Sequence, residues 1–137
     1  MPLARLCYTS QATKPDHLVR QDLMDIITEA VSFNAQHKIF GVLYYGNGYF
    51  FQCLEGDKND LEQLYYGKIT KDPRHQNATL MTIDPITELQ FSAWNMKFAP
   101  YHQSVMEFMR QQDRTQFDPN VLSTENLPAF LEILYQI

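Results

Sequence analysis

The chain has 137 residues and a formal net charge of −5, and 45% of its residues are hydrophobic while 20% are charged. This length and composition are typical of one globular domain with a substantial core. Lysine and arginine are scattered singly, and without a basic patch we expect no binding to nucleic acid or to an anionic membrane. The N-terminus lacks a signal-peptide pattern, and no apolar run approaches the roughly 18 residues of a membrane span. We therefore expect a cytoplasmic protein, with Cys7 and Cys53 as buried free thiols.

The first elements are a strand over residues 4–9 and a helix over 16–33. Polar residues and Pro15 separate the two. In the helix the apolar residues recur at the spacing of one face, which predicts that this face packs on a sheet. The residues of this stripe are Leu23, Ile26, Ile27, Ala30 and Phe33.

A β-hairpin follows over residues 39–45 and 49–55. Its turn, Gly46-Asn47-Gly48, contains residues that tolerate positive φ. Both strands are apolar on both faces, so we expect the sheet to be covered on both sides.

A second helix is predicted from Asp57, its capping residue, to Lys71, with Gly67 as an unusual interior residue. Two further strands are predicted over 79–83 and 90–98. The order βαββαββ is that of a ferredoxin-like α+β sandwich, with a five-stranded mixed sheet and two helices on one face. Short helices are predicted over 103–112 and 124–136.

The alternation of side chains along the strands predicts which residues share a face. Tyr8 and Gln52 should point toward the two main helices, whereas Cys7, Phe51 and Cys53 should point to the opposite face. That second face is apolar, so we expect the C-terminal helices to cover it or to lie at a subunit interface.

Tyr8 and Gln52 are also the residues with the most specific chemistry. A tyrosine donates one O–H, and a glutamine amide both donates and accepts, so a glutamine between a tyrosine and a ligand can relay a hydrogen bond and reverse it. From the residues alone, a buried tyrosine bonded to a structural glutamine is the favoured interpretation.

The chain resembles the BLUF domain, a flavin-based blue-light sensor, over about residues 4–98. No single motif is decisive, but their order and spacing together are specific. The matching segments are Arg5-Leu6-Cys7-Tyr8-Thr9-Ser10, Gln21-Asp22-Leu23-Met24-Asp25-Ile26-Ile27, Asn34, Ile39-Phe40-Gly41-Val42-Leu43, Phe50-Phe51-Gln52-Cys53-Leu54-Glu55-Gly56, Ile69-Thr70-Lys71-Asp72-Pro73-Arg74-His75 and Phe91-Ser92-Ala93-Trp94-Asn95-Met96.

The resemblance implies a photoactive group. Tyr8 would give an electron and a proton to the excited flavin, and Gln52, between Tyr8 and the ring, would change its hydrogen bonds. Ser10 would support the network, while Trp94 and Met96 would report the change to the fifth strand. Which of those two neighbours Gln52 is open, and core packing on one strand face also explains both.

The resemblance also implies a flavin-binding set. Ile26 and Ile69 would sandwich the ring between the two helices, although spacing alone favours a core role for both. Asn34 would bind the polar edge of the ring, or it could cap the first helix. The ribityl-phosphate side would meet Lys68, Asp72, Arg74 and His75, of which the last two could equally form a solvated loop.

Other polar residues receive no role in binding. Asp16, Asp22, Asp25 and Glu29 are predicted to form a solvated helix face, and His17, His37 and His102 show no metal spacing. No metal is expected.

The resulting hypothesis is a photoreceptor and not an enzyme, with residues 1–99 as the sensor domain and 100–137 as a helical extension. The expected cofactor is FAD, with FMN as the alternative. We expect a homo-oligomer that signals by contact with a downstream protein whose identity is open. The alternatives are a light-insensitive interaction module of the same fold and a small acylphosphatase-like hydrolase, although no Gly-rich loop follows the first strand.

Overall fold

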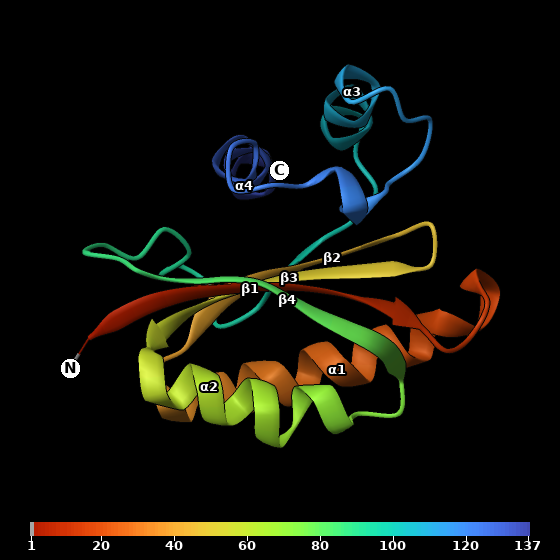
Figure 1. The fold of residues 1–137 in the computed structure, drawn as a ribbon. Coiled ribbons are helices and arrows are strands. Elements are labelled where there is room, and N and C mark those ends of the chain that lie inside the picture. Colours follow the sequence, from red (N-terminus) through yellow and green to blue (C-terminus); the bar gives the residue numbers. More distant parts are fainter. Residues whose placement is uncertain (1) are drawn as a thin grey trace.

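The computed structural model describes residues 2–137, so Met1, the first residue of the predicted sensor domain, lies outside the described residues. One sheet separates two helical layers (Figure 1). The elements, in chain order, are β1 (Leu3–Ala12), α1 (Asp16–His37), β2 (Phe40–Gly46), β3 (Tyr49–Asp57), α2 (Lys58–Gly67), the 3₁₀ turn η1 (Ile69–Lys71), β4 (His75–Pro85), β5 (Lys97–Ala99), α3 (Gln103–Gln111), the 3₁₀ turn η2 (Pro119–Val121) and α4 (Leu127–Gln136).

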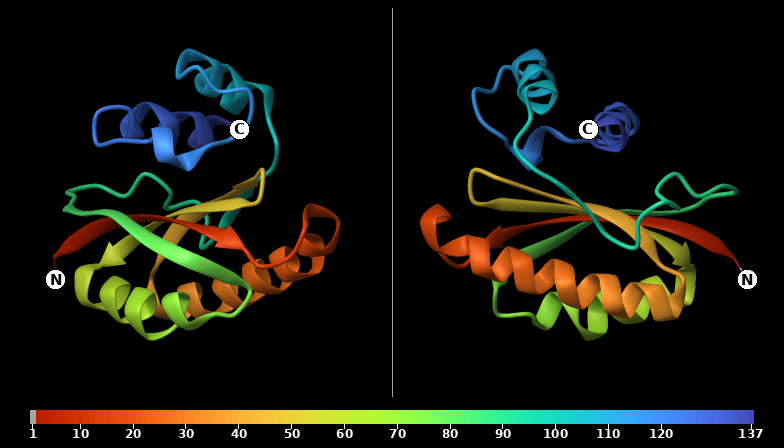
Figure 2. Two further views of the ribbon diagram at one scale, coloured as in Figure 1. Left: turned by 45° about the vertical axis from the view of Figure 1, so that its right-hand side comes forward. Right: turned by 180° about the vertical axis from the view of Figure 1, so that it is seen from behind.

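The predicted fold is confirmed. The five strands lie in the order β4-β1-β3-β2-β5, with antiparallel pairs throughout except for the parallel pair of β2 and β5. The helices α1 and α2 cover one face of this mixed sheet, and α3 and α4 lie over the other (Figure 2). The hairpin turn also follows the prediction, since Asn47 and Gly48 both have positive φ, at 51° and 81°.

The predicted division of the strand residues between the two faces is confirmed as well. Tyr8 belongs to the core cluster beneath α1 and α2, together with Leu6 and Leu54. The residues that alternate with these belong to the second cluster, with Phe130 and Leu134 of α4 among its members. The residues predicted for this second face are Cys7, Phe51 and Cys53. The C-terminal helices therefore bury the apolar face that the sequence left uncovered.

Several predicted boundaries were wrong, among them that of the first strand, which spans Leu3–Ala12, and that of the last helix, which begins at Leu127. The second helix ends at Gly67, where the low helix propensity of glycine permits the change to the 3₁₀ turn η1. The first helix runs on to His37, where Lys38 adopts the left-handed conformation and ends it. The fourth strand spans His75–Pro85 because it pairs along most of β1.

The predicted fifth strand over 90–98 was wrong in most of its length. Only Lys97–Ala99 pair with β2. Before them the chain turns, with the Trp94 amide donating to the Phe91 carbonyl at 3.0 Å. The Trp94 carbonyl then accepts from the Gly41 amide at 3.2 Å. The alternating side-chain pattern of a strand consequently does not apply to Trp94 and Met96.

Candidate functional site

A cavity of about 250 Å³ lies between the sheet, α1, α2 and η1. Its walls are apolar side chains, its inner end carries uncharged polar groups, and charged groups belong to its more exposed part. The lining residues of the first kind include Ile26, Ala30, Phe33, Leu43, Leu64 and Ile69; the polar ones are Tyr8, Asn34, Gln52 and His75; the charged ones are Glu29, Lys68, Asp72 and Arg74.

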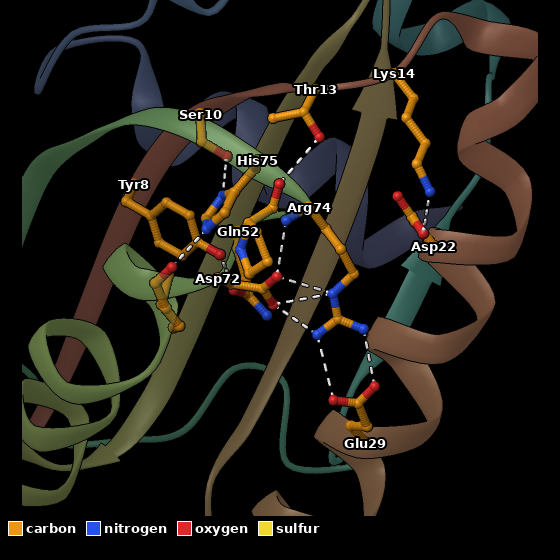
Figure 3. A network of polar contacts seen from close by, with 12 residues as sticks. Tyr8, Ser10, Thr13, Lys14, Asp22, Glu29, Gln52, Asp72, Arg74 and His75 are labelled. Carbon is orange, nitrogen blue, oxygen red and sulfur yellow. Dashed lines mark hydrogen bonds and ion pairs between the residues drawn. The ribbon is translucent and has the colours of Figure 1, made fainter.

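Tyr8 and Gln52 face each other at the inner end of this cavity. They are directly opposite in the antiparallel pairing of β1 with β3. Both are 5% exposed, and the Tyr8 hydroxyl donates to Oε1 of Gln52 (Figure 3). Burial, and then the neighbouring Tyr65 and Asp72, raise the pKa of Tyr8 well above its usual range. The phenol therefore stays protonated and remains a hydrogen-bond donor.

Met96 is the neighbour of Gln52 on the other side. The Gln52 amide nitrogen lies 3.6 Å from the Met96 sulfur, to which it donates. Trp94 instead packs against the cluster on the α3/α4 face, and Lys97 lies 4.4 Å above its ring. The prediction that Trp94 and Met96 share one strand face was wrong, because residues 90–96 form a turn and the two side chains lie on opposite sides of the sheet.

Asn34 lies within α1, and the residue that caps this helix is Lys38 and not Asn34. Asn34 is 1% exposed and lines the cavity. Its amide nitrogen donates to the Asn95 carbonyl at 2.8 Å, so it holds the turn that precedes Met96. Its own carbonyl accepts from the backbone amides of Lys38 and Ile39 at the end of the helix.

Ser10 and His75 form a second polar group beside Tyr8. The His75 Nδ1 atom lies 2.6 Å from the Ser10 hydroxyl (Figure 3). The His75 Nε2 atom lies 2.5 Å from the Ile69 carbonyl. Since a carbonyl only accepts, Nε2 carries the proton, and in the neutral ring Nδ1 accepts from Ser10. This chain of contacts ties β1 to η1.

Arg74 lies among the charged residues of the cavity. Its guanidinium bonds Asp72 through Nε at 2.9 Å and Nη2 at 2.6 Å, and it bonds Glu29 through Nη1 at 2.8 Å (Figure 3). These hydrogen bonds hold the pKa of Asp72 below its usual value and raise that of Arg74. Lys68 lies 3.9 Å above the ring of Phe33.

Ile26 and Ile69 both line the cavity and are half-buried. Ile26 comes from α1, while Ile69 comes from the turn η1 and not from the second helix itself. The cavity thus has aliphatic side chains from two elements for a flat ring, amide donors and acceptors at its inner end, and two cations for an anionic group.

Two glutamates with structural roles were not singled out from the sequence, and of these only Glu29 lines the cavity. Glu29 is exposed, as predicted, but it also pairs with Arg74 and lines the cavity. Glu55 was given no individual role, although its carboxylate is fully buried. Register could have indicated Glu55, because Arg5 is directly opposite it on β1.

The predicted solvated face of α1 was wrong for Asp22. Asp22 is 8% exposed and pairs with Lys14 at 3.1 Å. The carboxylate of Asp16 accepts from the Tyr45 hydroxyl. Asp16 and Asp25 are exposed as predicted, and Asp25 accepts from Gln21 within the helix.

The family model "BLUF: Sensors of blue-light using FAD" matches residues 3–97 of this chain. The chain belongs to the BLUF family. It is a blue-light sensor domain that binds flavin, and the apolar walls and polar inner end of the cavity fit such a cofactor.

Solved BLUF structures resemble nearly the whole chain. The ground-state structure of BlsA is 40% identical with a TM-score of 0.91, covering 97% of this chain and 87% of that one. The dark-state structure of the BLUF protein BlrB is 25% identical with a TM-score of 0.78, covering 97% and 94%. Both similarities include the C-terminal helices, because they extend well past residue 97.

Among curated proteins, the photoactivated adenylate cyclase subunit beta of Euglena longa is 31% identical over 135 residues. The match covers 98% of this chain but only 13% of that protein. The chain thus spans only a small part of the length of the cyclase subunit. No helix found in residues 2–137 has the length and apolarity needed to cross a membrane.

Proposed function

We propose that Tyr8 and Gln52 form the light-driven relay of this BLUF domain, and that its output is a change in protein–protein contact made through the C-terminal helices. The observation that carries the proposal is the Tyr8–Gln52–Met96 chain of contacts at the inner end of the cavity. Bound flavin supplies the absorption of blue light and, once excited, an acceptor for an electron. Tyr8 supplies the electron and the phenolic proton, and both return to it as the relay relaxes.

Gln52 is the group whose hydrogen bonds differ before and after illumination. In the dark its Oε1 accepts from Tyr8 and its amide nitrogen donates to Met96. If the amide rotates by half a turn, its oxygen and nitrogen exchange places, whereas tautomerisation leaves both atoms in place and moves a proton from the nitrogen to the oxygen. A thioether sulfur has no hydrogen to donate, so an oxygen placed against Met96 makes no hydrogen bond. The contact between Gln52 and Met96 is therefore available in only one of the two orientations.

Lys97 connects this contact to α4. It follows Met96 directly, and its ammonium group lies 2.9 Å from the Leu134 carbonyl and 2.8 Å from the Tyr135 carbonyl. A cation at the C-terminal carbonyls of a helix is favourable because it meets the negative end of the helix dipole. A shift of Met96 therefore displaces the cation that caps α4.

Glu55 holds the start of the same segment in place. One of its oxygens accepts from the backbone amides of Gln90 and Phe91, each at 2.8 Å, and the other binds Arg5. Gln90 in turn donates to Glu132 of α4 at 3.2 Å. With residues 90–91 fixed to β3, motion at Met96 is directed forward along the chain toward Lys97.

The architecture of the output follows from this route. Residues 1–99 would act as the sensor and 100–137 as the extension that carries the signal to a downstream protein or a second copy of the chain. No substrate is turned over in this scheme, and the protein would act in the cytoplasm. The flavin carried would be FAD, with FMN accepted by the same ring contacts.

Hydrogen exchange of α4 tests the route in the dark and under blue light. In the native protein we expect light to speed exchange in the last turn of α4. In Lys97→Met the last turn should exchange faster already in the dark, by about tenfold for a loss of about 1.4 kcal/mol, and light should add little. Lys58→Met, an exposed lysine at the start of α2, is the matched control. An unchanged light response in Lys97→Met contradicts the route.

A further inference from the structure

Arg74 divides its hydrogen bonds between two carboxylates from different parts of the chain. Asp72 takes Nε and one bond from Nη2, and Glu29 takes Nη1 at 2.8 Å and the second bond from Nη2 at 3.2 Å (Figure 3). A guanidinium has five N–H groups in a fixed planar fork, so this arrangement leaves little of the fork for another anion.

The two carboxylates that bind Arg74 differ in their exposure and in the number of their hydrogen-bond partners. The Asp72 side chain is 22% exposed and also accepts from the backbone amide of Arg74 at 2.9 Å. The Glu29 side chain is 64% exposed, and within residues 2–137 its hydrogen bonds go to Arg74 alone. An exposed ion pair of this kind contributes little stability. Asp72 therefore orients the guanidinium, while Glu29 is the partner that another anion can replace.

A flavin phosphate that enters the charged part of the cavity needs a cation as its partner. Burial of a charged phosphate among apolar walls is strongly unfavourable without a paired cation. The described residues that line the cavity include two cations, Lys68 and Arg74. Arg74 is the one with a fork that matches phosphate in a bidentate manner.

We propose that Glu29 is a latch that competes with the phosphate of the flavin for Arg74, and so sets how strongly the domain distinguishes flavins with and without phosphate. Glu29 joins α1 to the loop before β4, whose Arg74 it holds beside the cavity. Riboflavin leaves this ion pair intact. FMN and FAD gain a phosphate contact only by displacing Glu29, and its carboxylate then repels the phosphate. This inference rests on the proposed placement of flavin in the cavity.

Equilibrium dialysis in the dark tests the proposal with riboflavin, FMN and FAD. For Glu29→Gln we expect FMN and FAD to bind about three- to tenfold more tightly, while riboflavin changes by less than about twofold. Asp25→Asn removes the same charge one turn earlier on α1, at a residue that does not line the cavity. In this control variant all three affinities should stay near those of the native protein. High salt should shrink the gain, since screening weakens a charge competition.

Two outcomes overturn the latch. An equal change for riboflavin would make Glu29 a general structural residue, and unchanged FMN binding would mean that phosphate does not reach Arg74. Failure of the native protein to bind riboflavin at all is a separate result, because it removes the placement of flavin in the cavity and the latch together. Native riboflavin binding with no FMN response in Glu29→Gln overturns the latch alone.

Discussion

The amide of Gln52 is held from both ends, with its oxygen accepting from Tyr8 and its nitrogen 3.6 Å from the sulfur of Met96. Its two faces meet partners of opposite character, a hydroxyl that donates and a thioether that only accepts. The orientation of the amide is therefore defined, because reversing it removes the contact with Met96, whereas the reversed nitrogen could still donate to the Tyr8 oxygen.

Tyr8→Phe should keep the flavin and abolish the light-induced red shift. The ring still fills its place, but the transferable O–H is gone, and the unpaired Gln52 oxygen should cost about 1 kcal/mol of stability. The measurement is absorption before and after blue light, together with urea unfolding. Tyr65→Phe is the matched control, since Tyr65 is also buried and lies 5.3 Å from Tyr8 between ring centroids. A normal photocycle in Tyr8→Phe would contradict the proposed mechanism.

Met96→Leu should separate the photochemistry from its transmission. Leucine nearly matches methionine in volume, so the core remains filled, but the Gln52 amide nitrogen loses its acceptor. We expect the red shift to survive and the light-induced change in α4 exchange to diminish. Trp94→Phe serves for comparison, because Trp94 packs on the other side of the sheet. Should Met96→Leu transmit the signal as the native protein does, Met96 is only a packing residue.

Glu55→Gln should destabilise the protein by roughly 3 kcal/mol, because a buried acceptor of two backbone amides and an arginine becomes an amide with its own donors. Urea unfolding measures this loss. Glu132→Gln is the exposed control and should change stability by under about 0.5 kcal/mol. Equal midpoints for the two variants would show that the Glu55 network does not hold the turn at residues 90–91.

Acid should weaken the charged part of the cavity. The hydrogen bond from Arg74 is the largest cause that lowers the pKa of Asp72 below its usual 3.8. A carboxyl group whose pKa is lower in the folded state than in the unfolded state stabilises the fold at any pH above its unfolded-state pKa. This stabilisation is lost as the pH falls through its folded-state pKa. We therefore expect the free energy of unfolding, measured between about pH 6 and about pH 3, to fall less in Asp72→Asn than in Asp25→Asn as the pH is lowered. Identical slopes would show that the pair contributes nothing.

The features that the sequence predicted well depend on local patterns of residues. The alternation along β1 and β3 placed Tyr8 and Gln52 on one face because the side-chain period of a strand is two. The turn at Asn47 and Gly48 followed from residues that tolerate positive φ. Neither inference needs a contact from elsewhere in the chain.

The features that the sequence predicted poorly depend on contacts between residues that are far apart in the chain. The spacing of Phe91, Trp94 and Met96 imitates a strand, but the Glu55 carboxylate, 36 residues from Phe91 in sequence, binds the backbone there. Glu29 likewise meets Arg74 across 45 residues. Exposed helical glutamates are usually solvated, so no local pattern distinguishes this one.

The most direct test of the account is the absorption spectrum of the purified, FAD-reconstituted protein in the dark, after blue light and during recovery. The account predicts a flavin spectrum that shifts slightly to the red under light and returns in the dark. A flavin spectrum that stays unchanged under light would contradict the Tyr8–Gln52 relay, and the absence of bound flavin would contradict the assignment of the cavity.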